Sequence, residues 1–277
     1  MCAFLVKQER NEFFMNFITL NGKKFIKRFF IFTLCFIFFS ICYLTSKDNI
    51  SIIETNAENF SLEEIHSNIQ NITKENQKIA YLTFDDGPTK SSTPRVLDIL
   101  KEENIKANFF VIGKYVNHHP NLLKRIYDEG HFIGNHGYNH SNSKLYGSDE
   151  SFINEITSTD KEISKALGVD NYCSHLFRFP YGFNSHVYKK EKLHCVELLK
   201  ELGYTYVDWN CLNKDSERKY NKHQLIQNLK KSSKDKNNLI ILMHDTTDVS
   251  DSASALKDSI HFIKEQGYQF KTFNELF

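Results

Sequence analysis

From about residue 78 to its end, the chain alternates short apolar runs with amphipathic stretches. Runs of strand length occur at Ile79–Phe84, Asn108–Ile112, His131–Gly134, Leu176–Phe179, Thr205–Trp209, Leu239–Met243 and Gln269–Phe273. Helical periodicity between them predicts helices at Thr93–Glu102, Asn121–Glu129, Ser151–Leu167, Lys192–Leu202, Lys222–Lys230 and Ala253–Gln266. Strands that alternate with helices indicate an α/β fold with parallel pairing and right-handed crossovers. Periodicity alone does not separate a doubly wound sheet from a closed barrel.

A different pattern precedes this region. The run from Phe29 to Ser46 carries no charged residue and is just long enough for a helix across a bilayer core. Residues 1–28 hold six basic and two acidic side chains, whereas residues 46–77 hold two lysines and six acidic residues. Because basic flanks stay on the cytoplasmic side, we expect a cytoplasmic segment at 1–28, a membrane anchor at 29–46 and an extracellular remainder.

A cleaved secretory signal is the alternative for this apolar run, and it would release the protein from the cell. Such signals end in small residues at the cut site, whereas Ile41, Tyr43 and Leu44 are bulky. A lipoprotein at Cys42 fits poorly for the same reason, and a buried core helix would not need the basic cluster before the run. The pattern therefore predicts a single-pass protein of the cell membrane.

Residues 47–77 are rich in Asn, Glu and Ser and show no compact apolar pattern. We expect a polar spacer here, with a short helix between Leu62 and Ile72, where apolar residues recur at helical spacing. The folded domain is expected at 78–277.

Composition excludes several classes of protein. Hydrophobic residues make up 40% of the chain and charged residues 25%, so the chain as a whole is not disordered. A net charge of +1 argues against nucleic acid as the main partner. Cys173, Cys195 and Cys211 lack CxxC spacing, which argues against a disulfide framework or a thiolate zinc cluster. We expect three free thiols, with one incidental disulfide as the alternative.

Polar residues gather where five of the predicted strands end. They are Asp85 and Asp86, His136 and His140, Arg178, Asp215, and His244. In parallel α/β folds the carboxyl ends of the strands converge on the face that holds the active site. These side chains are therefore predicted to meet in space, although about 160 residues separate the first from the last.

The residue types suggest a metal-dependent hydrolase. His136 and His140 with one carboxylate form a frequent three-ligand set for a divalent ion, which leaves a position open for water. Asp85 and Asp86 are adjacent at a strand end, so their side chains diverge: one can bind the ion and the other can accept a proton from the activated water. His244 could protonate a leaving amine.

Each motif also has an ordinary explanation. Asp-Asp-Gly is typical of turns, and spaced histidines are common on solvated helices. Arg178 could pair with a carboxylate through two parallel hydrogen bonds, although an Arg-x-Pro sequence is uninformative alone. The joint occurrence of these motifs at successive strand ends favours an active site.

The residues resemble the motif series of the carbohydrate esterase family 4 polysaccharide deacetylases, also called the NodB-homology domain. Residues 83–88 read TFDDGP, as in the first motif, and His136 to His140 match the second, with Gly137 where the family has Ser or Thr. Residues 178–181 and 242–244 match the third and fifth motifs. The resemblance covers 78–277 and implies a distorted (β/α) barrel of about seven parallel strands.

The resemblance also implies the metal site. Asp86, His136 and His140 would be the ligands of one divalent metal ion, and Asp85 would be the general base, oriented by Arg178. Zinc is the expected ion, with cobalt, manganese and iron as alternatives.

The remaining roles follow by position. The backbone amide of Tyr181, after Pro180, would stabilise the oxyanion, and Leu242 would line the pocket for the acetyl methyl group. His244 would be the general acid.

The fourth motif departs from the family pattern. Trp209 and Asp215 match its earlier Trp and its Asp, whereas Ser216 stands where the family commonly has a second Trp. Asp215 could still hold His244 in its charged form. The missing indole affects one wall of the sugar-binding groove, so stacking would rely on Tyr or Phe side chains, with Tyr138 and Tyr181 as candidates.

The expected function is deacetylation of N-acetylated amino sugars in a cell-wall polysaccharide, first of all peptidoglycan, at either N-acetylglucosamine or N-acetylmuramic acid. Chitin-type oligosaccharides are an alternative substrate, and a catalytically inactive wall-binding membrane protein is the alternative from another class. A metal-independent relative that hydrolyses cyclic amides is not expected, because all three metal ligands are present. Oligomeric state stays open.

Overall fold

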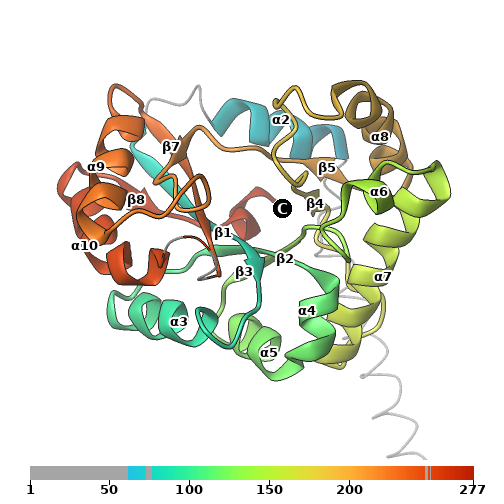
Figure 1. Cartoon of the computed structure of the whole chain (residues 1–277), viewed down its shortest axis with the longest axis horizontal. Coiled ribbons are helices and arrows are strands. Elements are labelled where there is room, and N and C mark those ends of the chain that lie inside the picture. The colour runs from blue at the N-terminus through green and yellow to red at the C-terminus, as the bar shows by residue number, and fades with distance from the viewer. Residues whose placement is uncertain (1–61, 73–76, 247–248, 250) are drawn as a thin grey trace, which may run out of the picture. The chain divides into compact units, whose positions relative to one another are not determined.

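The computed structural model describes residues 62–72, 77–246, 249 and 251–277 of the chain (Figure 1). The predicted cytoplasmic segment, the anchor at 29–46 and the spacer up to residue 61 lie outside the described residues. Among the residues described, none of the helices combines the length and the hydrophobicity that crossing a bilayer requires.

Parallel strands form one curved sheet, the frame of the molecule. They are β1 (Ile79–Gly87), β2 (Asn108–Val111), β3 (Phe132–Asn135), β4 (Leu176–Phe177), β5 (Thr205–Tyr206), β6 (Cys211–Leu212), β7 (Asn238–His244) and β8 (Gln269–Phe270). Their order is β5-β4-β3-β2-β1-β7-β6, and β8 pairs with the start of β1. β5 and β6 end this order, so the sheet in the described part is a partial barrel, in agreement with the distorted barrel expected.

Helices surround the sheet. They are α2 (Leu62–Ile72), α3 (Thr93–Glu102), α4 (Gly113–His118), α5 (Pro120–Asp128), α6 (Asn142–Leu145), α7 (Asp149–Leu167), α8 (Lys189–Glu201), α9 (Lys222–Ser233) and α10 (Ser252–Glu265), with a final 3-10 turn, η1 (Phe273–Leu276). The six helices predicted between strands are confirmed. Strand β6 and the short helices α4 and α6 were not predicted, because segments of two to six residues show no periodicity.

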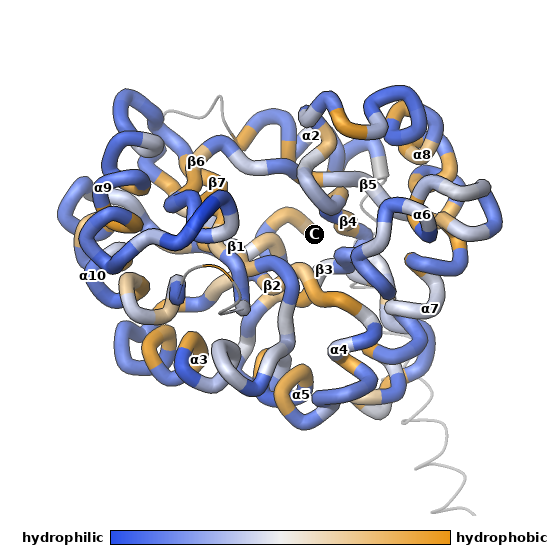
Figure 2. The backbone as a smooth tube through the Cα atoms, in the orientation of Figure 1, coloured by the Kyte–Doolittle hydropathy of each residue, from blue (hydrophilic) through white to orange (hydrophobic). Residues whose placement is uncertain are grey.

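Apolar side chains pack on both faces of the sheet. On the outer face, Leu82 and Phe84 of β1 belong to the same buried cluster as Leu97 of α3 and Ile260 of α10. In Figure 2 hydrophobic segments recur along the central strands and the helices, while hydrophilic segments dominate the outer loops. Burial on both faces explains why β1 and β7 read as nearly continuous apolar runs rather than alternating ones.

Helix α2 lies between β5 and β7 in the view of Figure 1 and adds to the inner face. Ile65, Ile69 and Ile72 share one face of the helix and pack with Tyr81 and Val207 in the cluster inside the barrel. The folded unit therefore extends on the amino side of the boundary expected at residue 78, because these isoleucines bury their surface against the barrel.

The three cysteines of the described region are free, as expected. Cys195 and Cys211 are buried and Cys173 is half-buried.

We predict that Ile65→Ala destabilises the domain by about 2–4 kcal/mol, because Ile65 is only 2% exposed and truncation leaves a cavity beneath α2. Urea unfolding of the whole chain measures this. Leu193→Ala is the matched control, since Leu193 is 55% exposed and its loss should change stability by less than about 0.5 kcal/mol. Equal effects of the two substitutions would contradict the docking of α2.

Candidate active site

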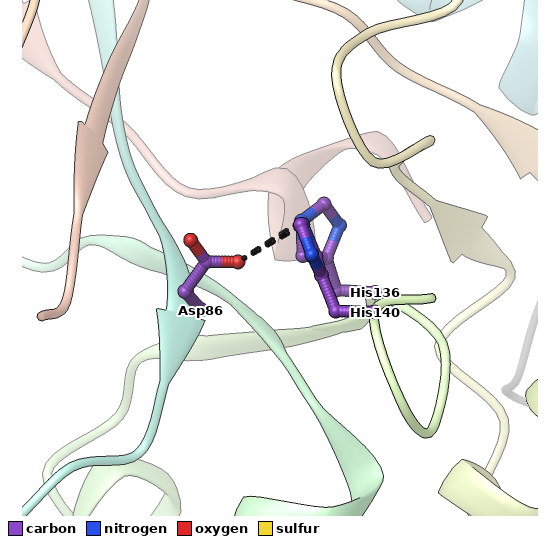
Figure 3. Close-up of side chains that lie close together, drawn as sticks. All are labelled: Asp86, His136 and His140. Carbon is purple, nitrogen blue, oxygen red and sulfur yellow. Dashed lines mark ion pairs between the residues drawn. The ribbon is translucent and has the colours of Figure 1, made fainter. Parts of the chain in front are cut away.

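The end of β1 separates two adjacent aspartates. The register between β1 and β2 shifts between Asp85 and Gly87, and Asp86 has a φ of 70°. This bulge sends the side chain of Asp85 toward the barrel interior and that of Asp86 toward two histidines (Figure 3). The divergence expected of the two carboxylates is thus present.

Three residues around the site have left-handed backbone conformations that side chains other than glycine adopt rarely. They are Asp86, His140 at a φ of 53° and Tyr181 at a φ of 64°. Each costs about 1–3 kcal/mol. Surrounding contacts must hold these residues in place, and such strain concentrates at functional sites.

Close packing behind the bulge requires glycine. A Cβ atom on Gly87 would lie 2.3 Å from Oδ2 of Asp245, which itself accepts a hydrogen bond from Thr93. The backbone N–H of Asp245 donates to the carbonyl of Asp85 at 2.7 Å. These contacts join the ends of β1 and β7 and fix the position of the two aspartates.

Asp86, His136 and His140 converge as expected for a metal site (Figure 3). Oδ1 of Asp86 lies 3.5 Å from Nε2 of His136 and 3.4 Å from Nε2 of His140. One potential ligand atom from each residue lies within 4.8 Å of the others. Nδ1 of His136 donates to the carbonyl oxygen of Arg178 at 2.7 Å, which leaves the Nε2 lone pair facing the site.

The polar atoms of this group fit a cation. Oδ1 of Asp86 is buried and makes no hydrogen bond within the described part of the chain. Burial alone would raise the pKa of Asp86, but His136, His140 and His244 lower it well below its usual range. An ionised buried oxygen facing two imidazole nitrogens is a donor set that suits zinc and similar ions.

Protons and a metal ion would compete for this site. Burial opposes protonation of His136, but Asp85 and Asp86 outweigh it and raise the pKa of His136. Burial and the neighbouring His136 lower the pKa of His140. Because a ligating imidazole must be neutral, metal affinity should fall as pH falls through the pKa of His136.

Arg178 is fully buried and reaches Asp85 across the barrel interior. Its Nη1 donates to Oδ1 of Asp85 at 3.0 Å and to Oγ1 of Thr83 at 2.6 Å, while Nε donates to the carbonyl of Val207 at 3.1 Å. The guanidinium carbon lies 4.1 Å from the ring centroid of Phe110. The pair of parallel hydrogen bonds considered for Arg178 and a carboxylate does not form. A single one reaches Asp85, and the other N–H groups donate to Thr83 and to the carbonyls of Val207 and Asp208.

His244 stands beside Asp85, since the two residues are register partners on β7 and β1. Oδ1 of Asp215 accepts a hydrogen bond from Nδ1 of His244 at 2.7 Å, and Oδ2 accepts from the His244 backbone at 2.8 Å. Ser252 also donates to Asp215. Burial disfavours the charged imidazole, but Asp215, with smaller contributions from Asp86 and Asp85, raises the pKa of His244 to about 9.

Tyr181 lies at the mouth of the site, 56% exposed, with its ring centroid 5.3 Å from that of His140. Among the described residues its backbone N–H has no hydrogen-bond partner. Pro180 precedes it and is buried, and Leu242 is buried on β7 next to Thr83 on β1. A free N–H beside the histidines can stabilise a developing negative charge.

Two charged side chains, one buried and one half-buried, hold the loop after Tyr181 in place. The ammonium of the fully buried Lys192 donates to the carbonyl of Gly182 at 2.5 Å and to Ser185 Oγ at 2.7 Å. Asp208 accepts from the backbone N–H groups of Phe183 and Asn184. The role of Lys192 could not be predicted from the sequence, because a buried lysine in an amphipathic helix has the same sequence pattern as a solvated one. No motif marked Asp208.

The resemblance implied a second tryptophan in the fourth motif, and Ser216 stands at that position. The Trp209 ring lies beneath the loop, where a Cβ on Gly182 would be 2.7 Å from it. Ser216, at the position of the family's second Trp, is exposed. The exposed ring at the mouth of the site is therefore that of Tyr181, whereas Tyr138 is half-buried.

Comparisons with known proteins identify related sequences. The family model described as polysaccharide deacetylase matches residues 72–207. The chain is 37% identical to a peptidoglycan-N-acetylglucosamine deacetylase of Bacillus cereus, over 73% of this chain and 89% of that protein. It is 35% identical to the peptidoglycan-N-acetylmuramic acid deacetylase PdaA of Bacillus subtilis, over 72% of each.

A solved structure shows the same fold. The catalytic domain of a peptidoglycan N-acetylglucosamine deacetylase from Eubacterium rectale superposes with a TM-score of 0.64 at 30% identity, covering 70% of this chain and 88% of that one.

We predict that Asp86→Asn weakens zinc binding more than 10-fold, because the amide removes the charge that faces both imidazoles. Asp85→Asn is the matched control, one residue away, and should keep one ion per chain. Equilibrium dialysis with elemental analysis measures both. Full metal content in the Asp86 variant would contradict the proposed ligand set.

Proposed function

The chain belongs to the polysaccharide deacetylase family, and on this premise we propose that it hydrolyses the N-acetyl groups of amino sugars in cell-wall peptidoglycan. The observation that carries the proposal is the convergence of Asp86, His136 and His140, with Asp85 and His244 beside them. An acetamide is a poor electrophile, so its hydrolysis needs an activated nucleophile, a base and an acid in one place.

Asp86, His136 and His140 would hold one divalent metal ion. Zinc fits this set, as do cobalt, manganese and iron. When bound, the ion supplies Lewis-acid chemistry, since it polarises the amide carbonyl and lowers the pKa of water.

Asp85 would act as the general base. Its carboxylate is buried, and the hydrogen bond from Arg178 keeps it oriented toward the site. Oδ2 of Asp85 lies 3.8 Å from Nε2 of His136. A water molecule next to the proposed metal ligands would therefore be close enough to Asp85 to give up a proton to it. Asp85 then accepts the proton that this water loses.

His244 would act as the general acid. With a pKa of about 9 it carries a proton at neutral pH, and Asp215 binds Nδ1 so that the Nε2 proton is free for the leaving nitrogen. Protonation of that nitrogen as the C–N bond breaks releases the amino sugar as an amine and the acetyl group as acetate.

The backbone N–H of Tyr181 would stabilise the oxyanion that forms on the acetyl oxygen, a contribution of roughly 3–4 kcal/mol to the barrier in comparable sites. Leu242 and Pro180 would line the pocket for the acetyl methyl group, since both are buried apolar residues on segments that end at this site. The exposed Tyr181 ring offers a stacking surface for a sugar.

Two relatives suggest different sugars within the same polymer, because one is named for N-acetylglucosamine and the other for N-acetylmuramic acid. Both sugars, and chitin-type chains, are candidates for this chain. The predicted anchor at 29–46 and the polar residues after it would hold the domain at the inner surface of the wall, and that location stays a prediction.

Acetate release from purified peptidoglycan and from N-acetylglucosamine oligomers tests the proposal. We expect release that EDTA abolishes and added zinc restores, whereas Asp85→Asn binds zinc and releases none. Mass spectrometry of the treated muropeptides identifies the sugar by the loss of one acetyl group. Zinc-loaded protein that leaves every substrate acetylated would contradict the proposal and favour a wall-binding role.

We predict that Asp215→Asn moves the alkaline limb of the pH–rate profile to lower pH. Asp215 raises the pKa of His244, and the acid works only while protonated, so activity in the wild type should persist to a pH above the usual pKa of an imidazole. Without the carboxylate the pKa falls, and the rate at pH 8.5 should drop about 10-fold or more.

Asp258→Asn, at an exposed carboxylate on α10, is the control and should leave the profile unchanged. An alkaline limb unaltered in the Asp215 variant would mean that His244 is not the acid.

A further inference from the structure

The loop between His136 and His140 is bound from behind by a buried carboxylate. Glu155 lies on α7, only 4% exposed. Its Oε2 accepts hydrogen bonds from the backbone N–H groups of Tyr138 at 2.9 Å and Asn139 at 2.8 Å, and its Oε1 accepts from the Asn139 side chain at 2.6 Å. One side chain thus binds two of the three residues between the histidines.

This loop determines how the two imidazoles lie relative to each other. His136 and His140 are four residues apart, but no helix joins them, and Gly137 and His140 have φ angles of 81° and 53°. Free loops with such conformations sample many others, and each would move one Nε2 away from Asp86. The geometry of the metal ligands therefore depends on what holds the loop.

Gly137 lets the loop adopt a left-handed backbone next to this carboxylate. A Cβ atom at Gly137 would lie 3.4 Å from Oε2 of Glu155, and the backbone there is left-handed. Helix α4 binds the carbonyls of the same loop. The N–H groups of Gly113 and Lys114 donate to the carbonyls of Gly137 and Tyr138 at 3.0 Å each. Glu155 and α4 thus bind the donors and the acceptors of the same loop.

Helix α7 is itself firmly placed. Phe152 and Ile156 on either side of Glu155 are fully buried in the core. One turn later, Asp160 accepts a hydrogen bond from Asn135 at 2.9 Å, and Asn135 accepts one from the N–H of Gly137 at 2.9 Å. The carboxylate of Glu155 therefore has a rigid base from which to position the loop.

We propose that Glu155 is a positioning residue for the metal site, which fixes the spacing of His136 and His140 so that both face Asp86. A carboxylate fits this place, because all three of its hydrogen-bond partners donate to it here, whereas glutamine has only one acceptor oxygen. In glutamine the amide NH2 would face either the Asn139 side chain or the two backbone N–H groups. The proposal rests on the metal site of the proposed function, and it concerns metal affinity rather than turnover.

Zinc affinity of the full chain, measured by competition with a chromophoric chelator, tests the proposal without substrate. We expect Glu155→Gln to bind zinc about 10–100-fold more weakly than wild type, the usual effect of removing a group that orients a ligand. Glu150→Gln is the matched control, because Glu150 is an exposed residue in the first turn of the same helix. It should bind zinc like wild type.

A second variant separates positioning from simple loss of folding. Asn139→Ala combined with Glu155→Gln removes the side-chain donor that would face the glutamine NH2. The glutamine oxygen can then accept hydrogen bonds from both backbone N–H groups. We expect this double variant to bind zinc more tightly than Glu155→Gln alone.

Two results would overturn the proposal: wild-type zinc affinity in Glu155→Gln, or no recovery in the double variant while circular dichroism shows both to be folded. Failure of the proposed function would look different, as a wild-type protein that binds zinc and releases no acetate.

Discussion

The structure depends on bringing one buried carboxylate oxygen and two imidazole nitrogens to a single point. The residues come from two strand ends that lie far apart in the sequence, and the parallel sheet places those ends on one face. Convergence alone does not make the site stable, because burying three polar ligand atoms that face one another without a cation is costly. The hydrogen bond from His136 to the carbonyl of Arg178 and those that Glu155 accepts from the loop offset part of that cost, whereas the left-handed backbone at Asp86 adds to it.

Buried charged side chains hold the other groups of the site in place. Arg178 orients Asp85, Asp215 charges His244, and Lys192 binds the loop that carries Tyr181. A buried ion is expensive unless several partners satisfy it, and each of these three has at least two. Groups fixed before substrate arrives need little reorganisation during the reaction, which is the main way that polar sites lower a barrier.

The sequence predicted most of this arrangement, for identifiable reasons. Strands such as β1 and β7 are long apolar runs with polar residues at their ends, so both the fold class and the candidate site could be read from pattern and motif. The sequence did not reveal β6, the split contacts of Arg178, or the roles of Glu155 and Lys192. Short strands lack periodicity, and a buried charge within a helix has the same sequence pattern as an exposed one. The packing of α2 on the barrel could not be predicted either, because three isoleucines at helical spacing indicate a buried face but not the surface against which it packs.

Anomalous X-ray diffraction at the zinc edge, on crystals of the zinc-loaded protein, would locate the bound ion. We expect one strong peak about 2.0–2.2 Å from an oxygen of Asp86 and from Nε2 of both His136 and His140, with Asp85 outside the coordination shell. A peak elsewhere, or one bound by Asp85 in place of Asp86, would contradict it.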